Sequence, residues 1–392
     1  MLYIIILLYI AWCMYIYDYK QYNSKWNYYF LCILFILVSG LSYRLGCDTI
    51  RYQHWFETDF NTPFDLNLFF NSSNVGGSAQ EPLWLISNWI FYNLFGKWWI
   101  FKTVIAAFVN ITIFSFIKKY TQVPYTAIML YALLYYFEIN FQVLRESVAI
   151  SLFLIGLKYI ISDNKVLWKY YFFIILASLF HRFAFIGVFY PLLINLKYDG
   201  RLLLIIIVIS IIIPYVAILL NSIVDLGLLN SLLGERVQDL VSSKTYGSNS
   251  RNIFGIIEML ILLVLPSLLL LKNNNDSPFL SLALVFVIIM IFRMTSLTII
   301  YRINNYLFFP FAIALSSSIN NSIYRLNYKR QSFAICKSYL MSFICILMFV
   351  GSSVKDIITS QDYIMYYPYS SVITKEEVLQ REIYYQDMYI FW

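Results

Sequence analysis

Two arginines and a carboxylate follow directly on an apolar stretch near the start of the chain. Arg44, Asp48 and Arg51 are spaced at i, i+4 and i+7 after the apolar residues 28–43. On a helix this spacing places the three side chains on one face. Guanidinium groups at a membrane surface suit a phosphate or an anionic headgroup, which they bind with paired hydrogen bonds. The alternative is a solvated helix end among interfacial aromatic residues.

A second polar group interrupts the apolar runs further along. Glu138, Gln142 and Arg145 repeat the same spacing where one run ends and the next begins, and Glu146 follows. An arginine near the bilayer centre costs about 2.5–3.5 kcal/mol on insertion scales, so such a group usually faces protein or a water-filled cavity. The alternative is a structural Arg–Glu pair that holds two helices together.

One of the two histidines of the chain stands beside an arginine. His181 and Arg182 lie between the apolar runs 166–180 and 183–196. An imidazole gains or loses a proton near neutral pH and can serve as a general base. The alternative is a histidine in a helix turn at the level of the lipid headgroups.

A third polar group lies late in the chain. Arg293 is placed within an apolar run and needs a partner or a cavity. Arg302, Asn305 and Tyr306 share one face if their segment is helical. The alternative is snorkelling of the arginines to the headgroups, which fits Arg302 better than Arg293.

The composition that surrounds these groups identifies a membrane protein. Of the 392 residues, 61% are hydrophobic and 12% are charged, whereas a soluble domain carries about twice that charge. We expect an all-α fold, in which residues 1–392 form one polytopic transmembrane helical bundle of about 12 spans. The expected spans are residues 2–17, 28–43, 98–117, 124–141, 144–161, 166–180, 183–196, 201–220, 253–271, 279–300, 301–319 and 333–351.

Lysines in the short loops indicate the orientation, because cytoplasmic loops carry an excess of basic residues. The lysine-rich loops are all cytoplasmic together only if residues 81–95 do not cross the membrane and instead lie on its outer surface or re-enter it. The outer face then holds a large loop, 44–97, a second loop, 221–252, and the C-terminal tail, 352–392. Both termini are expected outside, and the chemistry is expected there too.

Several kinds of site are not indicated. The chain contains no P-loop, no G-x-G-x-x-G motif and no His/Cys metal motif, so no cofactor or metal is expected. The net charge of +7 lies in short loops and does not indicate nucleic acid. Four of the five cysteines lie in apolar runs and only Cys47 is expected to face a polar environment, so no disulfide framework is predicted.

The motifs, taken in order, resemble those of the EpsG family of bacterial polysaccharide polymerases. The similar segments are 44–52 (R-x-G-x-D-x-x-x-Y), 81–82 (Glu-Pro), 144–149 (L-R-Q-x-x-A), His181, 302–306 (R-x-x-x-Y) and the tail element 367–369. The chain departs from this pattern at Cys47, where a small or hydroxylated residue is expected, and at Glu146, where glutamine is commoner.

The resemblance implies a Wzy-type polymerase in the bacterial cytoplasmic membrane, with its active site facing outside. Such enzymes build capsule, exopolysaccharide or O-antigen from oligosaccharide repeat units linked to undecaprenyl diphosphate. The donor is a growing glycan on this lipid, and the acceptor is one repeat unit on the same lipid. Membrane lipid, a chain-length regulator and a flippase are further partners that the resemblance implies, whereas nucleic acid is not.

This chemistry gives the polar residues expected roles. The arginines would stabilise the leaving diphosphate without a metal; they are Arg44, Arg51, Arg145, Arg182, Arg293 and Arg302. A general base would accept the proton of the attacking hydroxyl; the candidates are His181, Asp48 and Glu146. Of these we favour His181, because neighbouring arginines weaken a carboxylate as a base. Aromatic rings would stack on sugars, at Tyr52, Trp55 and Tyr306.

Other functions use similar features. A transporter or flippase for lipid-linked sugars would distribute charged residues through the depth of the membrane and on both faces, whereas here they concentrate on one face. A ligase that moves the glycan to another acceptor shares the diphosphate leaving group, so the sequence does not separate it from a polymerase. A membrane acyltransferase that modifies sugars is a further alternative.

Labelling of single cysteines tests the predicted orientation. In a Cys47→Ser background, cysteines introduced at Ser73, Ser78 or Ser352 should react with a membrane-impermeant thiol reagent in intact cells, because these positions are expected outside. A cysteine at Asn274 should react only after lysis. Reaction of the first three only after lysis would show the inverted orientation, and reaction at Asn274 in intact cells would contradict the number of crossings.

Overall fold

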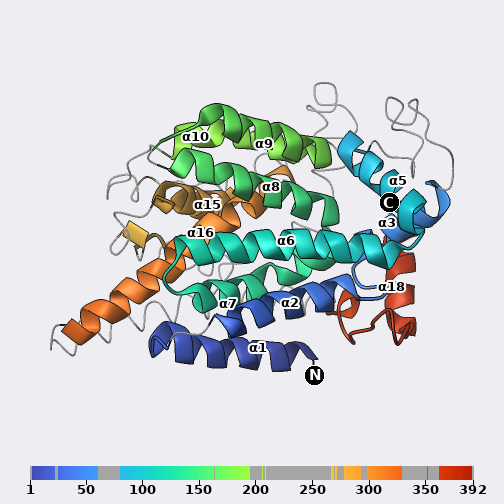
Figure 1. The fold of residues 1–392 in the computed structure, drawn as a ribbon, viewed down its shortest axis with the longest axis horizontal. Helices are drawn as coiled ribbons and strands as arrows, with labels where there is room; N and C mark the ends of the chain where they lie inside the picture. The colour runs from blue at the N-terminus through green and yellow to red at the C-terminus, as the bar shows by residue number, and fades with distance from the viewer. Residues whose placement is uncertain are drawn as a thin grey trace. The chain divides into compact units, whose positions relative to one another are not determined.

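The part of the chain that the computed structural model describes is built from helices and short connecting segments (Figure 1). The described residues are 2–22, 25–60, 80–162, 164–194, 266–268, 270–271, 278–292, 298–328 and 362–390, with single residues at 205, 208 and 351. No strand occurs among them, and the one β feature there is an isolated antiparallel bridge between Ser42 and Ser371. The all-α prediction is therefore confirmed for this part of the chain.

The described helices follow many, but not all, of the expected apolar runs. They are α1 (Leu2–Cys13), α2 (Trp26–Gly40), α3 (Cys47–Thr58), α5 (Pro82–Phe95), α6 (Trp98–Tyr120), α7 (Pro124–Leu134), α8 (Leu144–Ile161), α9 (Leu167–Phe180), α10 (Tyr190–Leu193), α15 (Leu280–Phe292), α16 (Thr298–Tyr328) and α18 (Leu379–Ile390). Two described helical stretches, Leu2–Tyr19 and Trp98–Tyr120, are long and apolar enough to cross a membrane. The expectation of about 12 spans stays a prediction. The expected loop 221–252 and Arg293 lie outside the described residues.

The chain divides into two compact units. Residues 1–188 and 352–392 form unit 1, and residues 189–351 form unit 2. In unit 2, α15 packs on α16, where the rings of Phe286 and Phe311 stack with centroids 4.4 Å apart. Arg302 and Tyr306 lie on α16. The other described residues with an expected role in the chemistry lie in unit 1.

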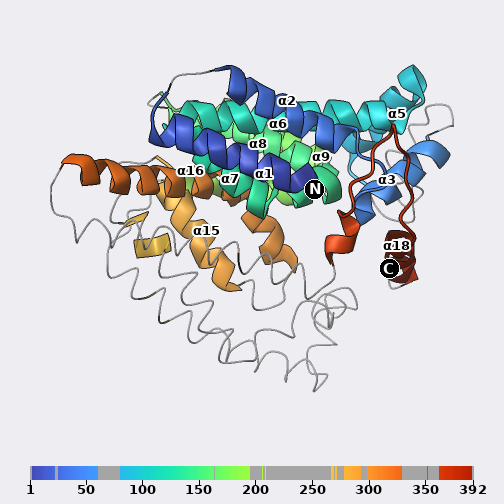
Figure 2. The same ribbon diagram turned by 90° about the horizontal axis from the view of Figure 1, so that it is seen from below.

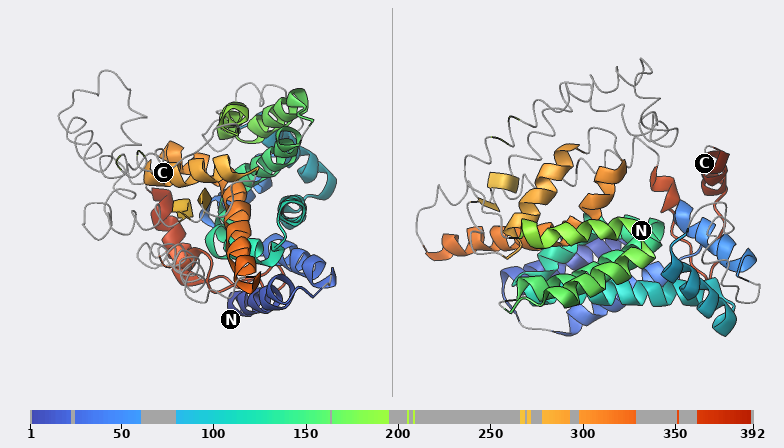
Figure 3. Two further views of the ribbon diagram at one scale, coloured as in Figure 1. Left: turned by 90° about the vertical axis from the view of Figure 1, so that its left-hand side faces the viewer. Right: turned by 90° about the horizontal axis from the view of Figure 1, so that it is seen from above.

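Helices α2, α6, α8 and α9 of unit 1 lie side by side (Figures 2 and 3). Buried amides fix part of this packing. Asn110 of α6 donates to Asn140 Oδ1 at 2.7 Å, Asn140 donates to Tyr131 Oη at 2.6 Å, and the Tyr131 hydroxyl donates to Asn110 Oδ1 at 3.2 Å. All three residues are buried. An amide left unpaired in such surroundings is costly. This closed ring of hydrogen bonds therefore sets the register of α6 against the end of α7.

The connections of unit 1 gather at two opposite ends of these helices. At one end, Asp18 accepts from the backbone N–H of Thr126 at 2.6 Å, beside the N-terminus of α7. Lys118, at the end of α6, donates to the Tyr29 hydroxyl at 3.1 Å. At the other end lie α3, α5 and α18, near the start of α6 (Figures 1 and 2).

Both ends of α5 lie near the start of α6. The ring of Trp84 is 5.5 Å from that of Phe101, and the ring of Phe91 is 4.9 Å from it. The helix has 14 residues, a length of about 21 Å. This is shorter than the hydrocarbon core, which is about 30 Å thick. Helix α9, an expected span, also has 14 residues, so length does not decide whether α5 crosses the membrane, and its interfacial or re-entrant placement stays a prediction.

The segment before α3 corrects one expectation from the sequence. Arg44, Asp48 and Arg51 do not share a helix face, because α3 begins only at Cys47 and Arg44 has a positive φ of 48°. The chain turns here because Gly46 follows with a φ of 85°, a conformation that suits glycine. Cys47 is also buried, with its Sγ 3.3 Å from Met365 Sδ, and does not face a polar environment as expected.

Gly46 brings α3 against the junction between α7 and α8. A Cβ atom at this glycine would lie 1.8 Å from the carbonyl oxygen of Phe141. The hydroxyl of Thr49 donates to the same carbonyl. Lys102 of α6 supports the segment from the other side, with its Nζ 2.5 Å from Ser42 Oγ. The start of α3 is therefore held by direct backbone contact.

Replacing Gly46 with alanine should destabilise the protein far more than the same change at Gly96. Both glycines have positive φ, but at Gly96 the nearest atom to a new Cβ lies 3.8 Å away. Gly96→Ala should cost about 1 kcal/mol from backbone strain alone, and Gly46→Ala more than about 4 kcal/mol. Thermal unfolding of the detergent-purified variants measures this, and equal shifts would contradict the contact.

Candidate functional site

A largely buried ion pair joins α5 and α8. Glu81 immediately precedes α5, and Arg145 is the second residue of α8. The Arg145 Nη1 lies 2.7 Å from Glu81 Oε2, with exposed side-chain fractions of 21% and 9%. The same nitrogen donates to Gln80 Oε1 at 3.2 Å. Because the two side chains are this little exposed, solvent screens the ion pair weakly and its geometry is held firmly.

Tyr52 of α3 completes the support of Arg145. Its hydroxyl accepts from Arg145 Nε at 3.1 Å, and the guanidinium carbon lies 5.3 Å from the centre of its ring. The ring of Trp84 packs against the ring of Tyr52, with the two centroids 5.2 Å apart. Tyr52 and Trp55 are both buried. Sugar stacking by these two residues stays a prediction, and the structure gives Tyr52 a contact with Arg145 instead.

Glu81 also binds the segment that follows α9. Its Oε1 accepts from the backbone N–H of Arg182 at 3.3 Å and lies 4.0 Å from Arg182 Nε. The Arg182 side chain is 73% exposed. His181 ends α9 in an extended conformation and is buried. The residues Tyr52, Gln80, Glu81, Arg145 and Arg182 are called the Arg145 cluster below, and His181 adjoins it.

Three helices begin at or near the Arg145 cluster. They are α3, α5 and α8, and their N-termini have no side-chain cap. An acidic residue stands at each of them: Asp48 in the first turn of α3, Glu81 before α5 and Glu146 in the first turn of α8. Uncapped N–H groups and the helix dipoles make such termini favourable for negative charge. The arrangement therefore attracts anions, including those of the protein itself.

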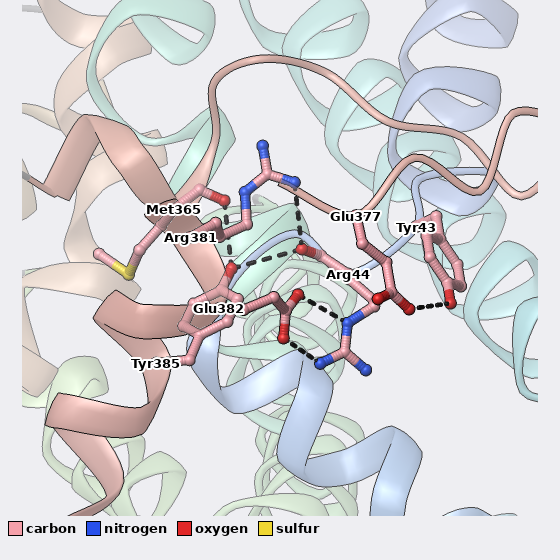
Figure 4. Close-up of polar contacts among 7 residues, drawn as sticks. All are labelled: Tyr43, Arg44, Met365, Glu377, Arg381, Glu382 and Tyr385. Carbon is pink, nitrogen blue, oxygen red and sulfur yellow. Dashed lines mark hydrogen bonds and ion pairs between the residues drawn. The ribbon is translucent and has the colours of Figure 1, made fainter. Parts of the chain in front are cut away.

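Arg44 is held by the C-terminal tail (Figure 4). Its Nε lies 2.8 Å from Glu382 Oε1 of α18, and its Nη2 contacts Oε2 of the same carboxylate. This two-pronged contact raises the pKa of Arg44 above its ordinary value. Tyr43 beside it donates to Glu377 at 3.4 Å.

A buried arginine anchors the tail at the same place. Arg381 is fully buried and donates to the backbone carbonyls of Ile364, at 3.0 Å, Arg44, at 3.4 Å, and Pro368. Tyr385 donates to the Arg44 carbonyl at 3.4 Å (Figure 4). Burial lowers the pKa of Arg381. The backbone of Arg44 is thus fixed from the tail, just before the turn at Gly46.

The comparison with known families decides the identity. The profile of the EpsG family matches residues 25–371, nearly the whole chain. This chain belongs to the EpsG family. EpsG is a Wzy-like polysaccharide polymerase family, and membership indicates a membrane protein with a polymerase-type glycosyltransferase activity. No curated protein and no solved structure matches the chain.

The structure groups several of the residues singled out in the EpsG sequence motifs. Arg145, Tyr52 and Arg182 are in contact with one another or with Glu81. Asp48 is close enough to interact electrostatically with Arg145. Arg51 is on the same helix, with its guanidinium carbon 5.8 Å from the ring of Trp55.

The Arg145 cluster is defined within unit 1, and four further expected residues are not among its members. Arg44 belongs to the tail contact, Arg293 lies outside the described residues, and Arg302 and Tyr306 lie in unit 2. Their roles in phosphate or sugar binding stay predictions. In the described part of the chain, no three His, Cys, Asp or Glu side chains gather as metal ligands.

The sequence did not give Gln80, Glu81, Arg381 and Glu382 a role. For Glu81 a signal was present, because a residue before a proline at the first helical position marks a helix start, and the Glu-Pro pair belongs to the EpsG pattern. For Arg381 and Glu382 no local signal exists. Glu382 is 338 residues from Arg44 in the chain, and both tail residues lie beyond the segment that the family profile matches.

The two ion pairs should differ in strength. Glu81→Ala leaves the largely buried Arg145 without its carboxylate and should lower the free energy of unfolding by about 3 kcal/mol. The Arg44–Glu382 pair is more exposed, at 28% and 22%, so Glu382→Ala should cost only about 1 kcal/mol. Double-mutant cycles of both pairs in unfolding experiments give the two coupling energies. A larger coupling for the tail pair would contradict this order.

Proposed function

We propose that this EpsG-family protein joins oligosaccharide repeat units carried on undecaprenyl diphosphate, at the outer face of the bacterial cytoplasmic membrane. A hydroxyl of the acceptor's distal sugar attacks the anomeric carbon of the donor glycan. The bond from that carbon to the diphosphate breaks, and the hydroxyl proton passes to a base. The observation that carries the proposal is the Arg145 cluster, which lies at the uncapped N-termini of α5 and α8 and beside α3, in a chain of this family.

The arginines are proposed to stabilise the leaving group. Negative charge grows on the diphosphate as the glycosidic bond breaks, and preorganised donors stabilise it best when they need not move. Arg145 meets this condition, because three contacts with Tyr52, Gln80 and Glu81 fix its guanidinium. Arg182 offers an exposed guanidinium beside it. Arg44, Arg51, Arg293 and Arg302 are proposed as further phosphate ligands.

His181 is the favoured general base. It directly precedes Arg182, whose backbone N–H binds Glu81, so it lies at the edge of the Arg145 cluster. Asp48 and Glu146 remain alternatives, but each stands in the first turn of a helix. A helix N-terminus stabilises the charged form of a carboxylate, which makes these residues better suited to balance arginines than to accept a proton.

The simplest test supplies purified protein with lipid-linked repeat unit as the only substrate. A polymerase uses the repeat unit both as donor and as acceptor, so a ladder of products that differ by one unit should appear on a gel. A ligase needs a different acceptor, and a flippase makes no product. The absence of a ladder under conditions in which the substrate is bound would refute the proposal.

Arg145 variants should lose chain extension. Arg145→Ala should reduce the rate by about 10²–10³-fold, as expected when a preorganised donor to a developing charge is removed. Arg145→Lys should remain impaired, because an ammonium group does not reproduce the planar fork that reaches three partners. Lys118→Ala, which removes a positive charge at the opposite end of α6, serves as the control and should extend normally. Full activity of Arg145→Lys would leave only a generic role for the charge.

His181 variants test the base. His181→Ala and His181→Gln should both bind the donor lipid but extend chains about 10²–10⁴-fold more slowly, the usual loss for a general base. Glutamine has a similar reach and can form hydrogen bonds, but it does not accept the proton. His54→Gln on the exposed side of α3 is the matched control. Near-normal polymer from His181→Gln would transfer the role to Asp48.

A further inference from the structure

Among the described residues, the buried amide nitrogen of Gln80 has no acceptor. The residue is 5% exposed, and its Nε2 forms no hydrogen bond with this part of the chain. The assignment of the two amide atoms is secure, because the guanidinium of Arg145 can only donate. The atom 3.2 Å from Arg145 Nη1 must therefore be the oxygen, and the group left unpaired is the NH₂.

An unpaired buried donor is unfavourable in a folded protein. Leaving such a group without a partner costs about 1–3 kcal/mol, and most buried polar atoms are paired for this reason. The group that satisfies Gln80 must accept hydrogen bonds and must fit beside Arg145. Both oxygens of Glu81 are already occupied, one by Arg145 and the other by the backbone of Arg182.

The surroundings of Gln80 favour an anionic acceptor. None of the hydrogen bonds between Arg145 and the described residues uses its Nη2, so that nitrogen has donors to spare. Gln80 directly precedes Glu81, which stands at the N-terminus of the 14-residue helix α5. Arg182 adds an exposed guanidinium nearby. Neighbouring donors of this kind, near a positive helix end, suit an oxygen that carries negative charge.

We infer that the Gln80 amide and the Arg145 guanidinium together bind one non-bridging oxygen of the lipid diphosphate. This inference rests on the proposed function, and it assigns a phosphate ligand that carries no charge of its own. The amide would add a directed hydrogen bond to the charge of Arg145. A sugar carboxylate offers the same anionic oxygen chemistry, so the experiment must separate the two sources.

The sharpest variant is Gln80→Glu. It keeps an oxygen opposite Arg145 Nη1 but replaces the free NH₂ donor with a second acceptor, which repels an anion. The contact to Arg145 becomes an ion pair, which offsets part of the cost of burying a second carboxylate beside Glu81. Gln80→Met removes the donor without adding charge. Gln386→Glu and Gln386→Met, at an exposed position on α18, are the matched controls.

Binding of undecaprenyl diphosphate and of glucuronate to the full-length protein in detergent is measured by calorimetry for all variants. Gln80→Met should weaken the binding of undecaprenyl diphosphate about tenfold, the effect of one charge-assisted hydrogen bond, and Gln80→Glu should weaken it further. Both Gln386 variants should bind like the wild type. Wild-type affinity of both Gln80 variants, with their thermal unfolding unchanged, would overturn the inference, and so would a loss confined to glucuronate.

The test of Gln80 and the test of the polymerase activity can fail independently of each other. A wild-type protein that builds a ladder while its Gln80 variants bind undecaprenyl diphosphate normally would refute only the role of Gln80. A protein that builds no ladder but loses affinity for undecaprenyl diphosphate on substitution of Gln80 would keep the binding site and refute the polymerase.

Discussion

Unit 1 depends on a contact between two backbones, that of Gly46 and the carbonyl group of Phe141. No residue with a Cβ fits there, since that atom would lie 1.8 Å from the carbonyl oxygen. The contact seats the start of α3 on the junction that leads into α8. Tyr52 lies about one and a half turns after the first residue of α3, and its hydroxyl contacts Arg145 at the start of α8. The position of the central guanidinium therefore follows from a glycine that does no chemistry.

At this end of unit 1 the carboxylates offset the charge of Arg145 but leave some of its N–H groups unused. Asp48, Glu81 and Glu146 each stand at a helix N-terminus, where the dipole stabilises their negative charge. Glu81 orients Arg145 without using all of its N–H groups. A guanidinium with no carboxylate partner would be costly to bury, and one with every donor occupied could not bind a ligand. The cluster lies between these limits, which is what binding a charged leaving group requires.

The sequence predicted much of the helix content and only part of the site. Apolar runs of the right length marked α6, α8 and α9 within a few residues, because burial in a membrane leaves a strong compositional signal. The prediction that Arg44 shares a helix face with Asp48 and Arg51 was wrong. An i, i+4, i+7 spacing does not reveal the turn that Gly46 introduces with its positive φ. The partners of the arginines, Glu81 and Glu382, were not predicted. Pairing across 64 and 338 residues is set by tertiary packing, on which local patterns carry no information.

The arginines of the EpsG motifs are not equivalent once their partners are known. Glu382 occupies Arg44 through Nε and Nη2, the edge that a phosphate would use for paired hydrogen bonds. A phosphate can take that edge only by displacing the carboxylate, whereas Arg145 can bind one without releasing Glu81. The tail helix that carries Glu382 lies beyond the residues that the family profile matches. Under the proposed function we therefore expect Arg145, supported by three residues within the matched segment, to be the better placed of the two to contact phosphate, whereas Arg44 attaches the tail to the turn before α3.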